Sequence, residues 1–167
     1  FYEFTFDNVT EEGAGTVENE GNGGEASASI DGSKEGLGVF YDEERASKVL
    51  NLPGGDTNGA TEGRLTLPDN MFQSVTNAGF AFSFWINIDE STGSYSRIFS
   101  GTVNGQNSDN GGGNWDAPEF AFVAGGGDYV TTVVNSDKSV NTRLTWDSVF
   151  ARGQWQHVTL SVSPAAY

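Results

Sequence analysis

The chain has no cysteine, which excludes disulfide bonds and thiolate metal sites. It has a single histidine, His157, so chemistry that needs two histidines is also excluded. No apolar run approaches the roughly 20 residues of a membrane-spanning helix, and we expect no membrane insertion. Basic residues are scarce, with 8 Lys and Arg against 23 Asp and Glu, and the formal net charge is -15. Such a charge should repel nucleic acid and suits an extracellular protein, either secreted or on the cell surface.

The residues that are present indicate an all-β domain. A length of 167 residues suits one domain, 1–167, with one sizeable core. Short apolar segments alternate with turns rich in the 23 glycines, and no long helix-forming run occurs. Residues 8–26 are acidic and glycine-rich, so we expect a long loop there. The pattern predicts an antiparallel β-sandwich (jelly roll). Strands are expected near residues 1–7, 26–30, 36–41, 47–53, 63–68, 79–89, 95–100, 119–123, 129–134, 142–146 and 154–162.

The strongest strand signal is the segment 79–89, which has a period of two. Its large apolar residues share one parity, and small or polar residues occupy the other, apart from Trp85. Successive strand side chains point to opposite faces, so one face of this strand should enter the core. The apolar residues are Phe80, Phe82, Phe84, Ile86 and Ile88.

Three stretches resemble the laminin-G-like, concanavalin-A-like lectin and glucanase jelly-roll domains of secreted bacterial proteins. They are Tyr2 to Asp7, Phe80-Ala81-Phe82-Ser83-Phe84-Trp85-Ile86, and Gly153-Gln154-Trp155-Gln156-His157-Val158-Thr159-Leu160. Domains of this family continue past the tryptophan–histidine strand with further closing strands. The resemblance therefore implies a domain that lacks its closing C-terminal strands and is a fragment of a larger chain. It also gives His157 a structural hydrogen-bonding role.

The resemblance further implies a Ca²⁺ site on the loops. Asp7 ends the first predicted strand, and Asp31, Asp56 and Asn58 lie in glycine-rich turns. Calcium takes six to eight oxygen ligands, which these side chains and nearby carbonyls could supply in part. The alternative is that these acidic loops are simply solvated.

Sugar binding is the second predicted chemistry, because sugars stack on flat aromatic rings while polar neighbours fix their hydroxyl groups. Trp115 lies in a glycine-rich loop and is either an exposed platform or a lid over the sandwich. Asn110, Asp128 and Tyr129 are its candidate neighbours. Trp85 could line the concave outer face of one sheet, although packing in the core or under a loop is the favoured interpretation.

Catalysis is the competing class. Jelly-roll glycoside hydrolases hold two carboxylates on one strand face, and no such acidic run occurs here. Asp89 and Glu90 come nearest, but adjacent residues of a strand point to opposite faces. We expect a non-catalytic accessory module that binds a glycan or polysaccharide and is attached to other domains, such as a glycoside hydrolase. The alternatives are a structural or adhesion module that binds protein, and a truncated glycoside hydrolase.

Overall fold

The computed structural model describes residues 1–9, 15–54, 63–68, 71, 80–92, 96–102, 119–124, 128–133, 141–146 and 150–162. The named elements of these residues are eleven strands, and the strand pairings with a defined register are antiparallel. This confirms the predicted all-β antiparallel class. Contacts divide the chain into two compact units, one of residues 1–80 with 162–167 and one of residues 81–161. Each unit is described separately below.

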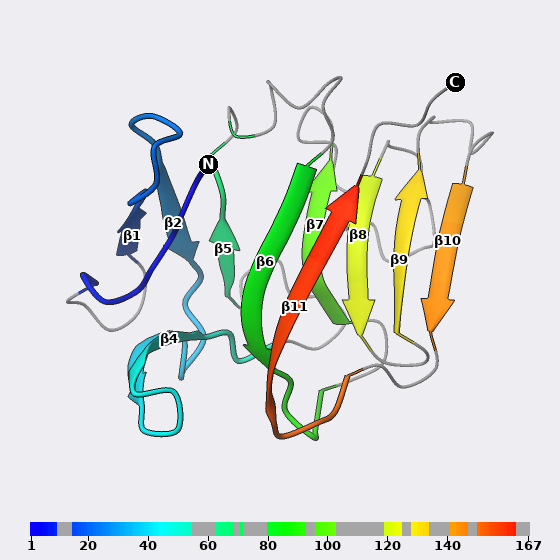
Figure 1. Cartoon of the computed structure of the whole chain (residues 1–167). Coiled ribbons are helices and arrows are strands. Elements are labelled where there is room, and N and C mark those ends of the chain that lie inside the picture. The colour runs from blue at the N-terminus through cyan, green and yellow to red at the C-terminus, as the bar shows by residue number, and fades with distance from the viewer. Residues whose placement is uncertain are drawn as a thin grey trace. The chain divides into compact units, whose positions relative to one another are not determined.

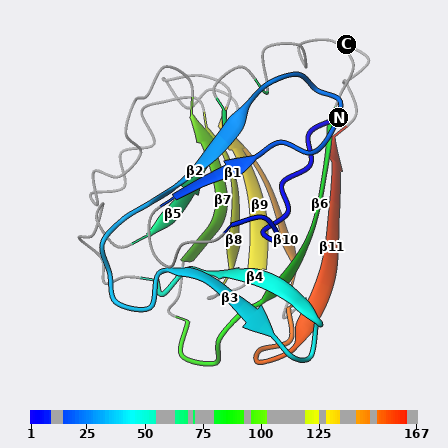
Figure 2. The same ribbon diagram turned by 90° about the vertical axis from the view of Figure 1, so that its left-hand side faces the viewer.

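The first unit contains one three-stranded sheet and one hairpin (Figure 2). In the sheet, β2 (Ser27–Asp31) lies between β1 (Gly15–Glu18) and β5 (Arg64–Thr66). The hairpin joins β3 (Gly38–Asp42) to β4 (Ser47–Asn51). Strands β2, β3, β4 and β5 fall within or next to the predicted segments, and exposure alternates along β2 and β5 but not along β3 and β4.

The core of this unit is built from both sheets. Val17 and Ile30 are each 1% exposed and belong to one cluster with Leu37 and Val39. Partly buried Phe4 packs against the same cluster. A fully buried aliphatic side chain stabilises a fold by about 1.5–3 kcal/mol, so this cluster is a major source of stability.

Two predictions for the N-terminal region are wrong. Residues 8–26 are not one long loop, since β1 lies within them and pairs with β2 from Gly15↔Ile30 to Glu18↔Ser27. A single buried apolar residue, Val17, is enough to place this glycine-rich, acidic segment on the core. The opening segment, residues 1–7, is not a full strand, and its pairing is an isolated bridge between Phe4 and Asn19.

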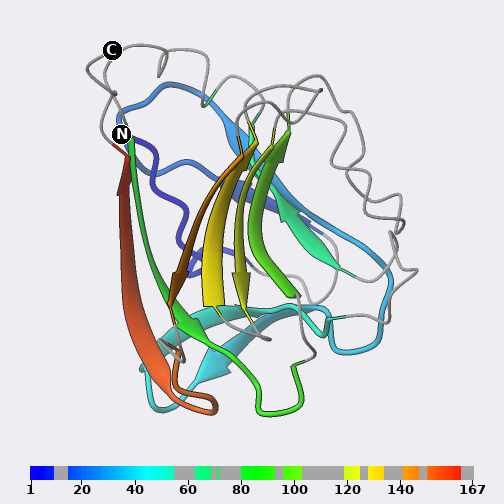
Figure 3. The same cartoon turned by 90° about the vertical axis from the view of Figure 1, so that its right-hand side faces the viewer.

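The second unit contains two sheets (Figure 1). Four antiparallel strands follow the order β10-β9-β8-β7: β7 (Ser96–Thr102), β8 (Glu119–Ala124), β9 (Asp128–Val133) and β10 (Asn141–Trp146). The other sheet pairs β6 (Phe80–Asn87) with β11 (Trp155–Val162). Figure 3 shows the two sheets of this unit as separate layers.

The apolar parity of β6 faces the core, as its period of two predicts. Its exposure alternates along all eight residues, with the apolar side chains half-buried and the others exposed. Phe84 and Ile86 pack with Ile88 and with Ile98 of β7 in one cluster. The rings of Phe82 and Phe99 have centroids 4.6 Å apart. These contacts join the β6–β11 sheet to β7, which is the sandwich arrangement expected.

Among the residues that the structure describes, no helix has the length and apolar character needed to cross a bilayer.

Candidate functional site on the outer face of the β6–β11 sheet

The parity of β6 and β11 that faces away from the core carries mainly polar side chains, together with Trp85 on β6 and the partly buried Trp155 at the start of β11. Val158 and Leu160 of β11 join the core cluster, so their neighbours along the strand must point the other way. We call the resulting surface the outer face. Its exposed residues are Ala81, Ser83, Trp85, Asn87, His157, Thr159 and Ser161.

The polar groups of the outer face are linked across the two strands. Ser83 Oγ lies 2.8 Å from His157 Nε2 and 3.4 Å from Thr159 Oγ1. The hydrogen bond expected for His157 is therefore present, and its partner is Ser83. Hydroxyl groups and a neutral imidazole each offer both a donor and an acceptor. The outer face can thus meet the mixed donor and acceptor pattern of a polyol.

Trp85 is the large exposed aromatic residue of this face. Its side chain is 49% exposed, so the interpretation that it packs in the core is wrong. The ring centroids of Trp85 and His157 lie 5.1 Å apart at an interplanar angle of 51°. The tilted contact holds the indole beside polar groups while about half of its surface stays open. A half-open aromatic ring next to hydrogen-bonding groups is the usual composition of a small-ligand surface.

The acidic pair at the end of β6 lies in a turn. Both the hydroxyl and the backbone N–H of Ser91 donate to Asp89 Oδ1, the latter at 2.7 Å. These hydrogen bonds hold the pKa of the Asp89 carboxyl below its usual range. The backbone N–H of Thr92 donates to the Asp89 carbonyl at 3.0 Å and closes the turn. Asp89 is therefore an ionised acceptor at neutral pH and a poor proton donor.

The other predicted sugar-binding residues are placed only in part. Asp128 and Tyr129 open strand β9, where they pair with Trp146 and Thr145 of β10. Trp115 and Asn110 lie outside the described residues. Among the predicted residues whose side chains the structure describes, Trp85 lies beside hydrogen-bonding side chains of β6 and β11.

The predicted calcium ligands Asp7 and Asp31 have separate sets of partners. Asp7 Oδ1 accepts a long hydrogen bond of 3.4 Å from the backbone N–H of Lys48, and its carbonyl accepts from Lys48 Nζ. Asp31 Oδ2 accepts from the hydroxyl groups of Thr66 at 2.5 Å and Ser29 at 3.1 Å. Arg64 Nε lies 3.8 Å from the same oxygen. Asp31 thus joins β2 to β5 through Thr66 and Arg64.

In the described ranges, no three His, Cys, Asp or Glu residues gather closely enough to hold a metal ion. Asp56 and Asn58 lie outside those ranges. The calcium site therefore stays a prediction.

The cross-strand role of Asp31 predicts a pH-dependent contribution to stability. Hydrogen bonding from Thr66 is the main reason why the pKa of Asp31 lies below its usual value. Partial burial raises this pKa, whereas the hydrogen bond from Ser29 and the charge of Arg64 lower it further. An unfolded aspartate titrates near pH ~3.9. Because the folded pKa is lower, the carboxylate stabilises the fold above that pH, and the contribution is lost as pH falls through the folded pKa.

We expect Asp31→Asn to lower the free energy of unfolding at pH 7 by up to about 1 kcal/mol, since the group is partly exposed. The difference from the original chain should shrink as the pH falls below about 4. Urea unfolding at several pH values measures this, with exposed Glu35→Gln as the control. A difference that stays constant with pH would contradict the assignment.

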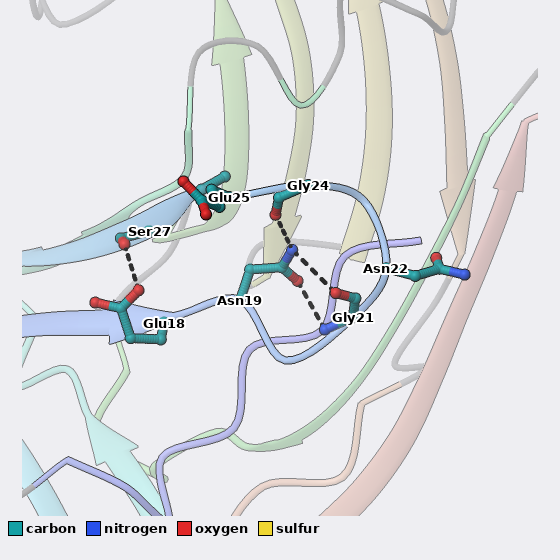
Figure 4. Close-up of a pocket in the computed structure, with 8 residues that line it drawn as sticks. Glu18, Asn19, Gly21, Asn22, Gly24, Glu25 and Ser27 are labelled. Atoms are coloured by element: carbon teal, nitrogen blue, oxygen red, sulfur yellow. Dashed lines mark hydrogen bonds between the residues drawn. The ribbon is translucent and has the colours of Figure 1, made fainter.

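A shallow hollow lies at the β1–β2 turn (Figure 4). Asn19 organises it, because its Nδ2 donates to the Gly24 carbonyl at 2.8 Å and its Oδ1 accepts from the Gly21 N–H at 3.0 Å. Ser27 Oγ donates to Glu18 Oε2 at 2.8 Å. These hydrogen bonds stabilise the turn itself, and we assign no ligand to the hollow.

The fold is that of a concanavalin-A-like β-sandwich. A laminin-G-type family model, described as the concanavalin A-like lectin/glucanases superfamily, matches residues 57–166. The match spans 110 of the 167 residues (166 − 57 + 1), about two thirds, and includes the whole outer face. The chain belongs to this superfamily, which confirms the resemblance. No curated protein and no solved structure matches the chain.

The sequence did not reveal that Ser83 and Thr159 belong to one site with Trp85 and His157. A signal was present, because the polar residues of each strand, apart from Gln156, fall on one parity. The pairing of β6 with β11, about seventy residues apart, was needed to bring those two parities onto one surface.

Proposed function

We propose that this domain is a non-catalytic carbohydrate-binding module of a secreted or cell-surface protein. The observation that carries the proposal is the half-exposed indole of Trp85 beside the hydrogen-bonded groups of Ser83, His157 and Thr159. The apolar face of a sugar ring would stack on the indole, and its hydroxyl groups would bond to the neighbouring side chains. Membership in a superfamily whose description names lectins and glucanases agrees with this chemistry.

The turn at the end of β6 supports a binding role over hydrolysis. A glycoside hydrolase needs one carboxylic acid with a raised pKa to protonate the leaving oxygen. The pKa of Asp89 is instead lowered by the hydrogen bonds from Ser91. The catalytic activity of the parent protein would then reside in another domain.

The test is binding of the purified chain to a broad panel of immobilised glycans, with release of reducing ends measured in parallel. We expect saturable binding to at least one glycan and no release of reducing ends. If the chain binds none of the plant, mucin and bacterial glycans, the proposal is rejected and a structural or adhesion module is favoured. Release of reducing ends would reject the non-catalytic assignment.

Calcium stabilisation is proposed separately, for the loop that contains Asp56 and Asn58. A ligand that binds only the native state raises the unfolding midpoint. We therefore expect added Ca²⁺ to raise the thermal midpoint of the EDTA-treated chain, and Asp56→Asn to reduce that increase. Asp31→Asn should leave the calcium-dependent increase unchanged, because its carboxylate is already bonded to Thr66 and Ser29. An unchanged midpoint in Ca²⁺ would reject the site.

A further inference from the structure

The two strands of the outer face contain no charged residue. The chain has 31 acidic and basic residues, 23 and 8 respectively, yet the sequences FAFSFWIN of β6 and WQHVTLSV of β11 include none of them. The outer face therefore presents hydroxyl groups, an amide, an imidazole and an indole. Such groups can bond a neutral ligand fully, whereas a carboxylate or sulfate seated there would meet no Lys or Arg from either strand.

Negative charge lies next to this neutral surface. Asp89 and Glu90 are exposed and follow β6 after one buried residue, Ile88. The hydrogen bonds from Ser91 favour the ionised form of Asp89. The chain as a whole carries a formal charge of -15. Both the local and the overall charge therefore repel an anion that approaches the outer face.

From this juxtaposition we propose that the outer face takes uncharged glycans and discriminates against glycans that carry carboxylate or sulfate groups. The inference rests on the proposed function and adds the class of ligand to it. The selectivity has two causes. First, an anionic sugar that stacks on Trp85 meets no basic side chain of β6 or β11 to neutralise its charge. Second, the acidic chain repels the anion as it approaches. The second cause depends on ionic strength, because the Debye length falls from about 30 Å at 0.01 M salt to about 8 Å at 0.15 M.

The experiment compares glycans that share a backbone and differ in charge. Suitable pairs are hydroxyethylcellulose with carboxymethylcellulose, fully methyl-esterified polygalacturonate with polygalacturonate, and dextran with dextran sulfate. Affinity gels or biolayer interferometry at about 0.02 M and 0.5 M salt give the dissociation constants. For every glycan backbone that the chain binds, we expect the dissociation constant of the neutral member at low salt to be at least about tenfold lower than that of the anionic member. The ratio of the two dissociation constants should decrease at high salt, because salt screens the repulsion between the acidic chain and the anionic glycan.

The possible failures are distinguishable. Equal or tighter binding of the anionic members at low salt overturns this inference and leaves the proposed carbohydrate binding intact. If the chain binds no member of any pair and no glycan of the panel, both the proposed function and this inference are overturned.

A variant that adds one positive charge locates the effect on the outer face. Thr159→Lys places a cation beside Ser83 and should raise the affinity for the anionic members several-fold. Ser33→Lys is the matched control, since exposed Ser33 lies in the first unit and the change in net charge is the same. An equal gain in both variants would assign the selectivity to net charge and overturn the role of the outer face.

Discussion

Replacing Trp85 with alanine is expected to weaken glycan binding by about tenfold or more. A central aromatic contact in a binding surface typically contributes at least ~1.4–2 kcal/mol, and each 1.4 kcal/mol is a factor of ten in affinity. Because the side chain is 49% exposed, its loss should change the thermal midpoint far less than loss of a core residue. Isothermal titration with the best ligand from the glycan panel measures the affinity, and calorimetry measures the midpoint.

Tyr41→Ala is the matched control, because Tyr41 is an exposed aromatic residue, at 59%, on β3 of the first unit. It should leave the affinity for the glycan unchanged.

Trp115→Ala distinguishes between the two aromatic residues predicted to stack on the sugar, Trp85 and Trp115. If Trp115→Ala abolishes binding while Trp85→Ala has no effect, the site includes Trp115, and the outer face is not the binding surface.

Replacing Ile30 with alanine is expected to cost about 2–5 kcal/mol of unfolding free energy, a large fraction of the stability of a typical domain. Ile30 is 1% exposed and belongs to the cluster of Val17, Leu37 and Val39, so truncation leaves a cavity as well as losing apolar burial. Urea unfolding gives the change in free energy. Leu52→Ala is the control, because Leu52 is 45% exposed and should change stability by less than about 1 kcal/mol.

The same variant tests whether the chain is one domain, as its length and composition predict. All four tryptophans, Trp85, Trp115, Trp146 and Trp155, belong to the second unit, so their fluorescence follows the unfolding of that unit. Ile30 belongs to the first unit. In a single cooperative domain, Ile30→Ala must lower the midpoint reported by tryptophan fluorescence. An unchanged fluorescence midpoint, together with loss of far-ultraviolet dichroism at lower urea, would show that the units unfold independently.

The period of two was a sufficient guide to most strands. It placed β2, β6 and β11 within one or two residues of their observed bounds, because a half-buried strand must alternate its side chains between core and solvent. It failed for β1, where one buried residue, Val17, is too weak a signal among glycines and acids. It also overestimated residues 1–7, whose alternation is loose and whose pairing is an isolated bridge at Phe4.

The sequence by itself determined the all-β class, the superfamily, the inward face of β6 and the absence of charge from β6 and β11. These are local properties, set by the alternation and composition of single segments. Only the tertiary structure decided that Trp85 is exposed and that Ser83 of β6 contacts His157 and Thr159 of β11. The same holds for Asp31, whose partners on β5 make it a cross-strand link. Contacts between strands far apart in the chain depend on pairing and register, which no single segment encodes.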